Sequence, residues 1–289
     1  MAWEAALILL TQTIHAAVPI LLAAVGEILA ERSGVVNIGL EGLMLIGAFV
    51  GVLVGDVTSS GLLGILAACA VGLALGLLHG AIAVYLRGDQ IVAGVAMNLF
   101  AAGLVAYGIQ AVWHVAGYKQ TPQWALVDPN VFTALAFAIS FIVWYILNKT
   151  RLGIIIRAVG EDPEAAYSAG IDVFKVRLIA TAVGAALASL GGAYLSQAYL
   201  SVVTKDISAG RGFIALADVV FANWNPLLAV AGSLIFGFFD AFSYWLQLYG
   251  FVRYEVTRMM PYIATLLVVA GVIGKARPPR ALGKPFKKE

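Results

Sequence analysis

Residues 160–172 read GEDPEAAYSAGID, a short polar stretch between two long apolar parts of the chain. Asp162 followed by Pro163 is typical of a helix start, because Asp caps free backbone N–H groups and proline suits the first turn. Gly170 is typical of a helix end. Five basic residues flank the stretch: Lys149, Arg151, Arg157, Lys175 and Arg177. The pattern predicts a short capped helix that a membrane protein offers to a partner on its basic side.

Outside this stretch the chain is strongly apolar. Of its 289 residues, 62% are hydrophobic and 12% are charged, and the mean hydropathy is +0.94. A soluble domain averages about 45–50% apolar and about 25% charged residues. Apolar runs long enough to cross hydrocarbon as helices recur from end to end. They predict an all-α, polytopic transmembrane helical bundle that forms one integral membrane domain over residues 1–289.

Nine membrane crossings are predicted, and some of them are short or broken. They cover residues 5–30, 42–55, 62–86, 91–115, 131–147, 178–203, 212–222, 227–248 and 259–273. The count falls to eight if residues 205–225 re-enter the membrane without crossing it. Residues 1–30 have the length of a signal peptide, but Glu4 stands where such a peptide carries basic residues, so we interpret them as a retained span.

The basic residues predict the orientation, because short cytoplasmic loops are enriched in Lys and Arg. The loop 148–177 holds five of them and the tail 275–289 holds six. If residues 205–225 cross once, 13 basic residues lie inside and 5 outside. The distribution therefore predicts a cytoplasmic C-terminus and an N-terminus outside.

Two glycine-rich interruptions carry polar residues into apolar surroundings. Residues 26–42 hold Glu27, Glu31, Arg32, Asn37 and Glu41, and residues 205–225 open a half-length span that holds Asp218. Broken helices of this kind point to a transport pathway, since unwound backbone is tolerated at membrane depth where it lines a cavity or is buried in protein. The candidate pathway residues are Asn37, Glu41, Gln90, Asn98 and Asp218.

Structural roles without a part in transport are the alternative interpretations for these residues. Glu31 and Arg32 suit an ion pair on an interfacial loop, and Asp218 and Asp240 suit polar contacts between helices. Two ladders of glycines spaced by four place small residues on one helix face. They are Gly47, Gly51 and Gly55, and then Gly72, Gly76 and Gly80. Each ladder suits either a subunit contact or packing within the chain.

No motif for catalysis or cofactor binding is readable. Gly274 and Lys275 lack the rest of a phosphate-binding loop. The three histidines lie on different predicted spans and form no metal-ligand spacing. We therefore predict no enzyme activity, no cofactor in this chain, no metal site and no nucleic-acid partner.

Four blocks of sequence resemble a known family. They are ERSGVVNIGLEGLMLIG at 31–47, DQIVAGVAMNL at 89–99, AVGEDPEAAYSAGIDV at 158–173, and GRGFIALADVVFANWNPL with GSLIFGFFDA within 210–241. The chain resembles permease subunits of bacterial ABC importers for branched-chain amino acids, ribose-type sugars and nucleosides. The blocks are most similar to the shorter of two permeases in nucleoside systems fed by basic-membrane-protein-like lipoproteins.

The resemblance implies a role for the stretch at 160–172. Glu164, Ala165, Ala166 and Gly170 match the EAA-x-x-x-G permease signature, although the proline that ends the longer pattern is missing before Pro226. The implied contacts to the ATPase are Glu161, Pro163, Glu164, Ala165, Ala166 and Gly170. The implied partners are a second homologous permease, cytoplasmic ATPase subunits that bind the ATP, an extracytoplasmic substrate-binding lipoprotein and the lipids of a bacterial cell membrane. Nucleosides are the first expected substrate and simple sugars the second.

Two other classes of function remain. A proton-coupled secondary transporter would use Glu27, Asp218 or Asp240 as relay carboxylates. This hypothesis does not explain the capped helix at 160–172. A membrane scaffold without transport is the third hypothesis.

Overall fold

The computed structural model describes residues 2–115, 117–248, 259–260, 262–266, 270 and 276–287. Within these residues, seven helices are long and apolar enough to cross a membrane. They are α1 (Ala2–Arg32), α2 (Leu40–Thr58), α3 (Gly61–Gly80), α4 (Gln90–Trp113), α5 (Pro129–Lys149), α8 (Val173–Tyr194) and α10 (Pro226–Leu248). The prediction of an all-α polytopic bundle is confirmed.

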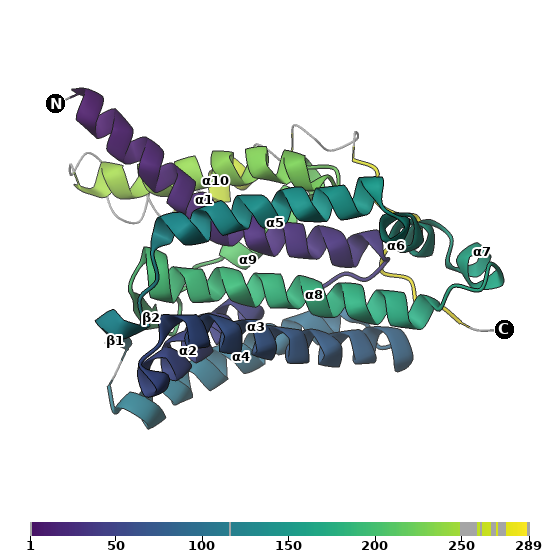
Figure 1. The fold of residues 1–289 in the computed structure, drawn as a ribbon, viewed down its shortest axis with the longest axis horizontal. Helices are drawn as coiled ribbons and strands as arrows, with labels where there is room; N and C mark the ends of the chain where they lie inside the picture. Colours follow the sequence, from purple (N-terminus) through teal and green to yellow (C-terminus); the bar gives the residue numbers. More distant parts are fainter. Residues whose placement is uncertain are drawn as a thin grey trace.

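Short elements mark the two ends of the bundle (Figure 1). At one end, β1 (Tyr118–Gln120) pairs antiparallel with β2 (Val202–Thr204), and we call this the ribbon end. At the other, α6 (Arg151–Glu161) and α7 (Pro163–Ser168) project beyond the long helices, and we call this the α7 end. The remaining short elements are the π-helical turns η1 (Ala81–Tyr85) and η3 (Leu195–Tyr199), the 3-10 turn η2 (Gln123–Ala125), and α9 (Arg211–Phe221).

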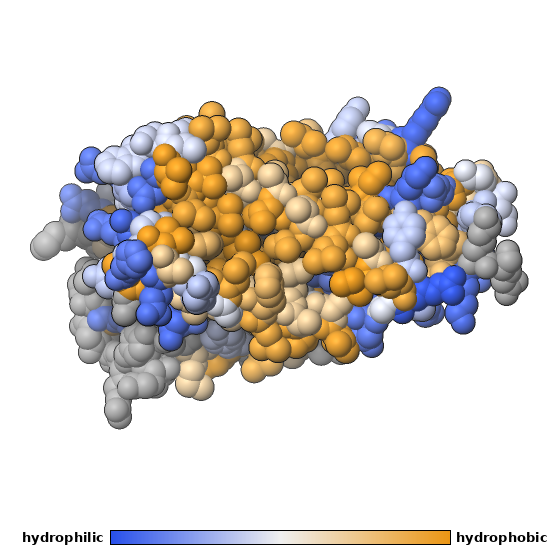
Figure 2. Space-filling view, turned by 90° about the horizontal axis from the view of Figure 1, so that it is seen from below, coloured by the Kyte–Doolittle hydropathy of each residue, from blue (hydrophilic) through white to orange (hydrophobic). Residues whose placement is uncertain are grey.

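The surface carries a broad apolar band between the two polar ends (Figure 2). Large apolar side chains of α3, α4 and α5 are exposed there, such as Leu66, Leu99 and Ile142. A surface of this kind would be costly in water and is favourable in lipid. The chain is a multi-pass membrane protein.

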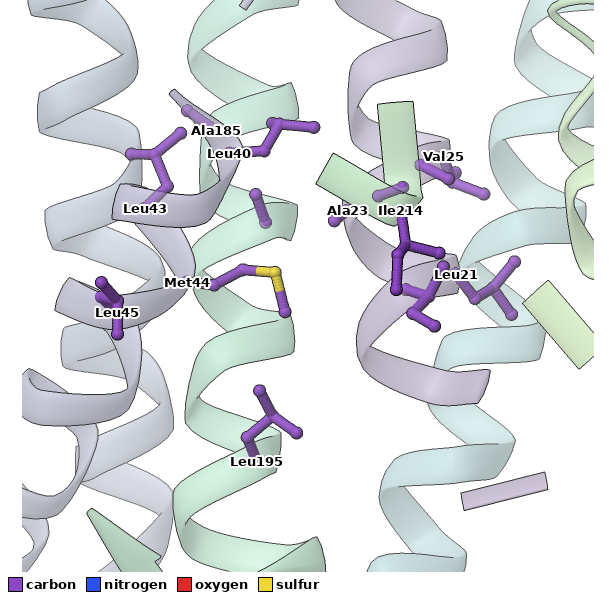
Figure 3. Packing of buried hydrophobic residues seen from close by; sticks show 14 of the residues in the cluster. Leu21, Ala23, Val25, Leu40, Leu43, Met44, Leu45, Ala185, Leu195 and Ile214 are labelled. Atoms are coloured by element: carbon purple, nitrogen blue, oxygen red, sulfur yellow. The ribbon is translucent and has the colours of Figure 1, made fainter. Parts of the chain in front are cut away.

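Helix α8 lies at the centre, packed against α1, α2 and α3. Small residues allow the close approach: Gly47 of α2 meets Ser189, and Gly76 of α3 meets Ala182 and Ala185. Both glycine ladders therefore pack within the chain, as the second of the two interpretations predicts. Apolar side chains such as Leu21 of α1 and Met44 of α2 fill the spaces between the helices (Figure 3).

Residues 202–224 run from one end of the bundle to the other. They begin in β2 at the ribbon end, and the carbonyls of Asn223 and Trp224 accept hydrogen bonds from Arg32, where α1 ends beside Gly160 of α6. Helix α9 has 11 residues, about 16 Å at 1.5 Å per residue, which is roughly half of a bilayer core. This segment therefore runs along the bundle once, as extended and turn backbone followed by one short helix. Of the ninth predicted span, 259–273, residues 261, 267–269 and 271–273 lie outside the described residues.

Candidate functional site

The first interruption is an unwound segment, residues 33–39, between α1 and α2. Helix α1 stops because Gly34 takes φ +100°, a left-handed conformation that favours glycine. The N–H of Val35 donates to Ala30 and the N–H of Gly34 donates to Glu31, which closes the end of the helix in a Schellman motif. The following residues, up to Gly39, then pass beside α1, α3 and α4 without helical structure.

Three buried side chains hold the middle of this segment. Gln90 Oε1 accepts from the N–H of Val36 at 2.8 Å, and His79 Nε2 donates to the Val36 carbonyl at 3.1 Å. Glu27 Oε1 accepts from the N–H of Asn37 at 2.7 Å. These groups replace the partners that a helix would have supplied, which is a requirement for backbone in apolar surroundings.

Asn98 holds the end of the segment and the start of α2. Its Nδ2 donates to the carbonyl of Ile38 at 3.0 Å, and its Oδ1 accepts from the N–H of Gly42 at 2.8 Å. Asn37 Oδ1 accepts from the N–H of Gly39 at 2.9 Å. The predicted pathway residues Asn37, Gln90 and Asn98 thus come together, and each of them bonds to backbone.

Glu41 joins the two interruptions. It lies in the first turn of α2, and its Oε1 accepts from Ser208 Oγ at 2.6 Å and from the N–H of Gly210 at 2.7 Å. Its Oε2 accepts from the N–H of Gly212 at 2.8 Å, at the start of α9. A carboxylate is favourable at a helix N-terminus, because free N–H groups and the helix dipole both attract negative charge. Glu41 therefore lies in the first turn of α2 and accepts hydrogen bonds at the start of α9, so that it connects the N-terminal ends of the two helices.

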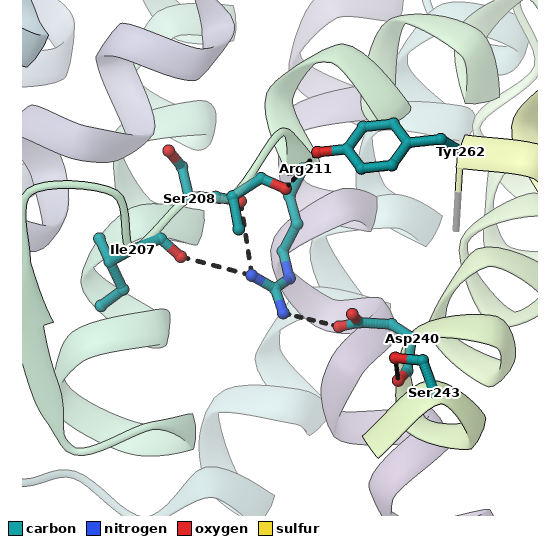
Figure 4. Close-up of polar contacts among 7 residues, drawn as sticks. Ile207, Ser208, Arg211, Asp240, Ser243 and Tyr262 are labelled. Atoms are coloured by element: carbon teal, nitrogen blue, oxygen red, sulfur yellow. Dashed lines mark hydrogen bonds and ion pairs between the residues drawn. The ribbon is translucent and has the colours of Figure 1, made fainter. Parts of the chain in front are cut away.

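An ion pair fixes the start of α9 from the other side (Figure 4). Arg211 Nη2 lies 2.6 Å from Asp240 Oδ2 of α10, and both side chains are largely buried. Arg211 Nη1 also donates to the carbonyls of Ile207 and Ser208, at 3.3 and 3.4 Å. Asp240, a candidate proton relay by sequence, is thus paired with Arg211, one of the five basic residues that the charge distribution placed in outside loops.

Asp218 has its partner on a different helix from the other pathway candidates. It is fully buried on α9, and its Oδ2 accepts from Ser233 Oγ of α10 at 2.6 Å. Its Oδ1 has no hydrogen-bond partner among the described residues. Gly232 leaves the room that the carboxylate occupies, because a side chain there would collide with Oδ1. Asp218 therefore connects α9 to α10, apart from the unwound segment.

The predicted surface pair of Glu31 and Arg32 is wrong. Adjacent residues on a helix point in different directions. Glu31 is buried and accepts from Trp224 Nε1, whereas Arg32 Nε donates to the Trp224 carbonyl at 3.1 Å and Nη2 donates to the Asn223 carbonyl at 3.4 Å. Asn223 and Trp224 take φ values of 49° and 57°, so Glu31 and Arg32 hold a strained turn between α9 and α10.

The helix expected at 160–172 is present as α7, and its caps are those expected. Asp162 Oδ1 accepts from the N–H of Ala165 at 2.9 Å, with Pro163 at the first position. At the other end Gly170 has φ +84°, and the N–H groups of Ile171 and Gly170 donate to Ala166 and Tyr167 in a second Schellman motif. The short helix is thus fixed at both ends.

The two faces of α7 differ. Ala166 is buried in a small cluster with Val159, Val173 and Phe286, whereas Glu164 and Ala165 are exposed. Asp172 caps the next helix, and the N–H of Lys175 holds the pKa of that carboxyl below its usual range. The anchored face fixes α7 to the bundle, and the exposed face is available to a partner.

Sequence reasoning missed the C-terminal strap, which we define as residues 276–287. The N–H of Ala281 donates to the Gly160 carbonyl at 2.9 Å, and the N–H of Gly283 donates to the Gly34 carbonyl at 3.1 Å. Phe286 packs against Tyr167 and Phe174, with ring centroids 5.7 and 5.4 Å apart. The strap therefore joins α6 and α7 to the start of the unwound segment.

Arg177 is the second feature that the sequence analysis missed. It is fully buried in the first turns of α8, where its Nε donates to the Ser33 carbonyl at 3.1 Å and its Nη1 donates to the Lys284 carbonyl at 2.8 Å. The charge count treated it as a loop residue. The available signal was its position four residues into an apolar helical run, where a cation must find partners.

These features define a membrane permease: a bundle with broken helices that meet at a shared carboxylate, and a capped helix that projects beyond one end. The chain belongs to the family of branched-chain amino acid transport system permease components, whose model matches residues 9–270.

Three relatives are similar over most of their length. The guanosine ABC transporter permease protein NupQ of Bacillus subtilis is 37% identical over 97% of both chains. A putative glucose ABC transporter permease protein of Haloferax volcanii, TsgC13, is 37% identical over 81% of this chain and 76% of its own. NupP, a second guanosine permease of B. subtilis, is 25% identical over 78% and 71%. No solved structure matches the chain. The chain is thus a permease subunit of an ABC importer.

The hydrogen bonds of Asn98 generate a test. We expect Asn98→Leu to lower the melting temperature and the recovery of monodisperse protein, because it leaves the Gly42 N–H and the Ile38 carbonyl unpaired at a cost of about 1–3 kcal/mol each. Leu99→Ala, at a neighbouring exposed position of α4, is the control and should change little. Normal stability of Asn98→Leu together with loss of transport would show a pathway contact instead of a structural one.

Proposed function

We propose that this chain forms, with a second related permease, the translocation pathway of a nucleoside importer driven by ATPase subunits in the cytoplasm. The observation that carries the proposal is α7: a rigidly capped helix with one face anchored and the other exposed, in a chain that matches ABC permeases over almost its full length. ATP would be bound by the ATPase subunits, and a substrate-binding lipoprotein would deliver the substrate from outside.

The contacts of α7 suggest how motion would reach the pathway. Closure of the ATPases would move α7 through Glu161, Pro163, Glu164, Ala165, Ala166 and Gly170. The strap bonds to Gly160 on one side and to Gly34 on the other, so that motion would be passed to the unwound segment. From there, Glu41 connects the segment to the start of α9.

Nucleosides are the favoured substrates because two of the relatives above are named for guanosine. Simple sugars are second, since another is named for glucose. We propose that Asn37, Glu41, Gln90 and Asn98 act by shaping the unwound backbone beside the pathway, and that Asp218 sets the position of α9. The two related permeases of B. subtilis support a pathway between paired subunits.

A proton-coupled secondary transporter is the alternative. It would need carboxylates that are free to exchange protons, yet Glu27 accepts from the Asn37 N–H and Asp240 is paired with Arg211. The third candidate, Asp218, accepts from Ser233 Oγ with one oxygen, and none of the residues that the structure describes is a partner of the other. Substrate uptake that survives an uncoupler while ATP is held constant favours the ABC mechanism, and uptake that collapses favours the alternative.

The proposed orientation places the α7 end in the cytoplasm of a bacterium and the ribbon end outside its cell membrane. The basic loop that carries α7 and the basic tail lie at the same end of the bundle, and this arrangement supports the positive-inside assignment. The N-terminus would then be outside.

The coupling role of α7 predicts a specific defect. Valine at Gly170 is strained at φ +84°, where β-branched residues are strongly disfavoured. We expect Gly170→Val, and separately Glu164→Arg, to leave the protein folded in the membrane but to reduce uptake per ATP hydrolysed by at least about tenfold. Ala169→Val places the same side chain on ordinary backbone and should have a smaller effect. Normal coupling in both test variants would exclude α7 as the ATPase contact.

Cysteine accessibility tests the orientation. In a Cys69→Ala background, Ser168→Cys should react with a membrane-impermeant maleimide only from the cytoplasmic side, and Gln123→Cys only from outside. Ser168 is the last residue of α7 and Gln123 is the first residue of η2, three residues after β1, and both are exposed. The opposite pattern would reverse the assignment.

A further inference from the structure

A cavity of about 250 Å³ lies at the α7 end, where the ends of α1, α5 and α6 meet the turn between α9 and α10. It shares Arg32, Asn223 and Trp224 with the contacts described above, but the proposed function gives the cavity itself no role. Pockets that enclose drug-sized ligands have volumes of roughly 300–1,000 Å³, so this cavity is small for a nucleoside. It has room for a compact polar group.

Two guanidinium groups line the cavity, those of Arg32 and Arg157. Among the described residues, neither forms a salt bridge with a carboxylate. Arg157 uses its Nε for the Gly153 carbonyl, and Arg32 uses its Nε and Nη2 for the carbonyls of the α9–α10 turn. Within the described part of the chain, both Nη groups of Arg157 and Nη1 of Arg32 have no protein acceptor.

The charges around the cavity favour an anion. Arg157 repels Arg32, and Glu161 is the acidic group that acts on Arg32. Glu161 is itself engaged, since its Oε2 accepts from the N–H of Arg280 at 3.4 Å. Glu161 attracts Arg32 more strongly than Arg157 repels it, but the two guanidinium groups and the one carboxylate together still leave one positive charge, which an anion between the guanidinium groups would balance.

Amide donors complete the lining. Asn223 Oδ1 accepts from the N–H of Arg277, and Asn225 Oδ1 accepts from the N–H of Leu227. Because the amide oxygens are used, the NH₂ groups of these two residues are what remains for a ligand. Guanidinium and amide donors together match the acceptor oxygens of a phosphate, which arginine binds in a bidentate manner.

Apolar residues at the edge of the cavity indicate which kind of molecule carries the phosphate. Leu228 lines the cavity and is 50% exposed, and the neighbouring Leu227 is 39% exposed, so the cavity lies beside apolar surface of α10. A phospholipid whose acyl chains cover this surface can place its headgroup among the arginines. Basic pockets between transmembrane helices bind anionic headgroups in this way.

We propose that this cavity binds the phosphate of an anionic phospholipid. The bound group would connect α6, which leads to α7, with the turn between α9 and α10. The proposal does not depend on which substrate is transported.

The test uses the full-length protein in detergent and counts bound lipid by native mass spectrometry. The wild type should bind phosphatidylglycerol at least about tenfold more tightly than phosphatidylcholine, a difference of about 1.4 kcal/mol. Arg157→Gln should lose most of this preference. Arg151→Gln removes the same charge from an exposed position of the same helix and should retain it. Arg157→Lys, which keeps the charge, tests binding if the glutamine variant does not fold.

Inorganic phosphate separates the two sources of the ligand. If millimolar phosphate raises the melting temperature in an Arg157-dependent manner while phosphatidylglycerol is not preferred, the cavity binds a free phosphate and the lipid assignment is overturned. Equal losses in Arg151→Gln and Arg157→Gln, or equal binding of the two lipids by the wild type with no Arg157-dependent effect of phosphate, would overturn the site altogether.

Discussion

Unwound backbone in a membrane must find its hydrogen bonds inside the protein, and this constraint organises the bundle. An unpaired buried N–H or carbonyl costs about 1–3 kcal/mol, and residues 33–42 present several of them. Glu27, His79, Gln90 and Asn98 supply the missing partners from α1, α3 and α4. The same contacts therefore fix these three helices around one segment.

Glu41 extends the arrangement to the second broken span. Its carboxylate accepts three hydrogen bonds from residues 208–212, so α9 begins where α2 begins. At the α7 end, Arg177 and the strap hold the start of the unwound segment against α6 and α8. A displacement of α7 is thus connected to α9 through hydrogen bonds.

Local signals were sufficient for some features and not for others. The caps of α7 were predictable because Asp162, Pro163 and Gly170 act within a few residues of one another. The long spans were predictable from hydropathy. The role of Asn98 was not, since its partners are 56 and 60 residues away along the chain. Arg177 and Arg211 were counted as loop charges, because only the tertiary structure shows that they are buried.

Hydrogen exchange in lipid nanodiscs tests the central claim most directly. If side chains hold the two broken spans, the amides of Val36, Asn37, Gly42, Gly210 and Gly212 should exchange at least about 100-fold more slowly than in an unstructured peptide, although Val36, Asn37 and Gly210 are not in a helix. In Glu41→Leu, protection should fall for Gly210 and Gly212 and persist for Val36. Exchange at the unstructured rate in the wild type, or unchanged protection of Gly210 and Gly212 in Glu41→Leu, would contradict the account.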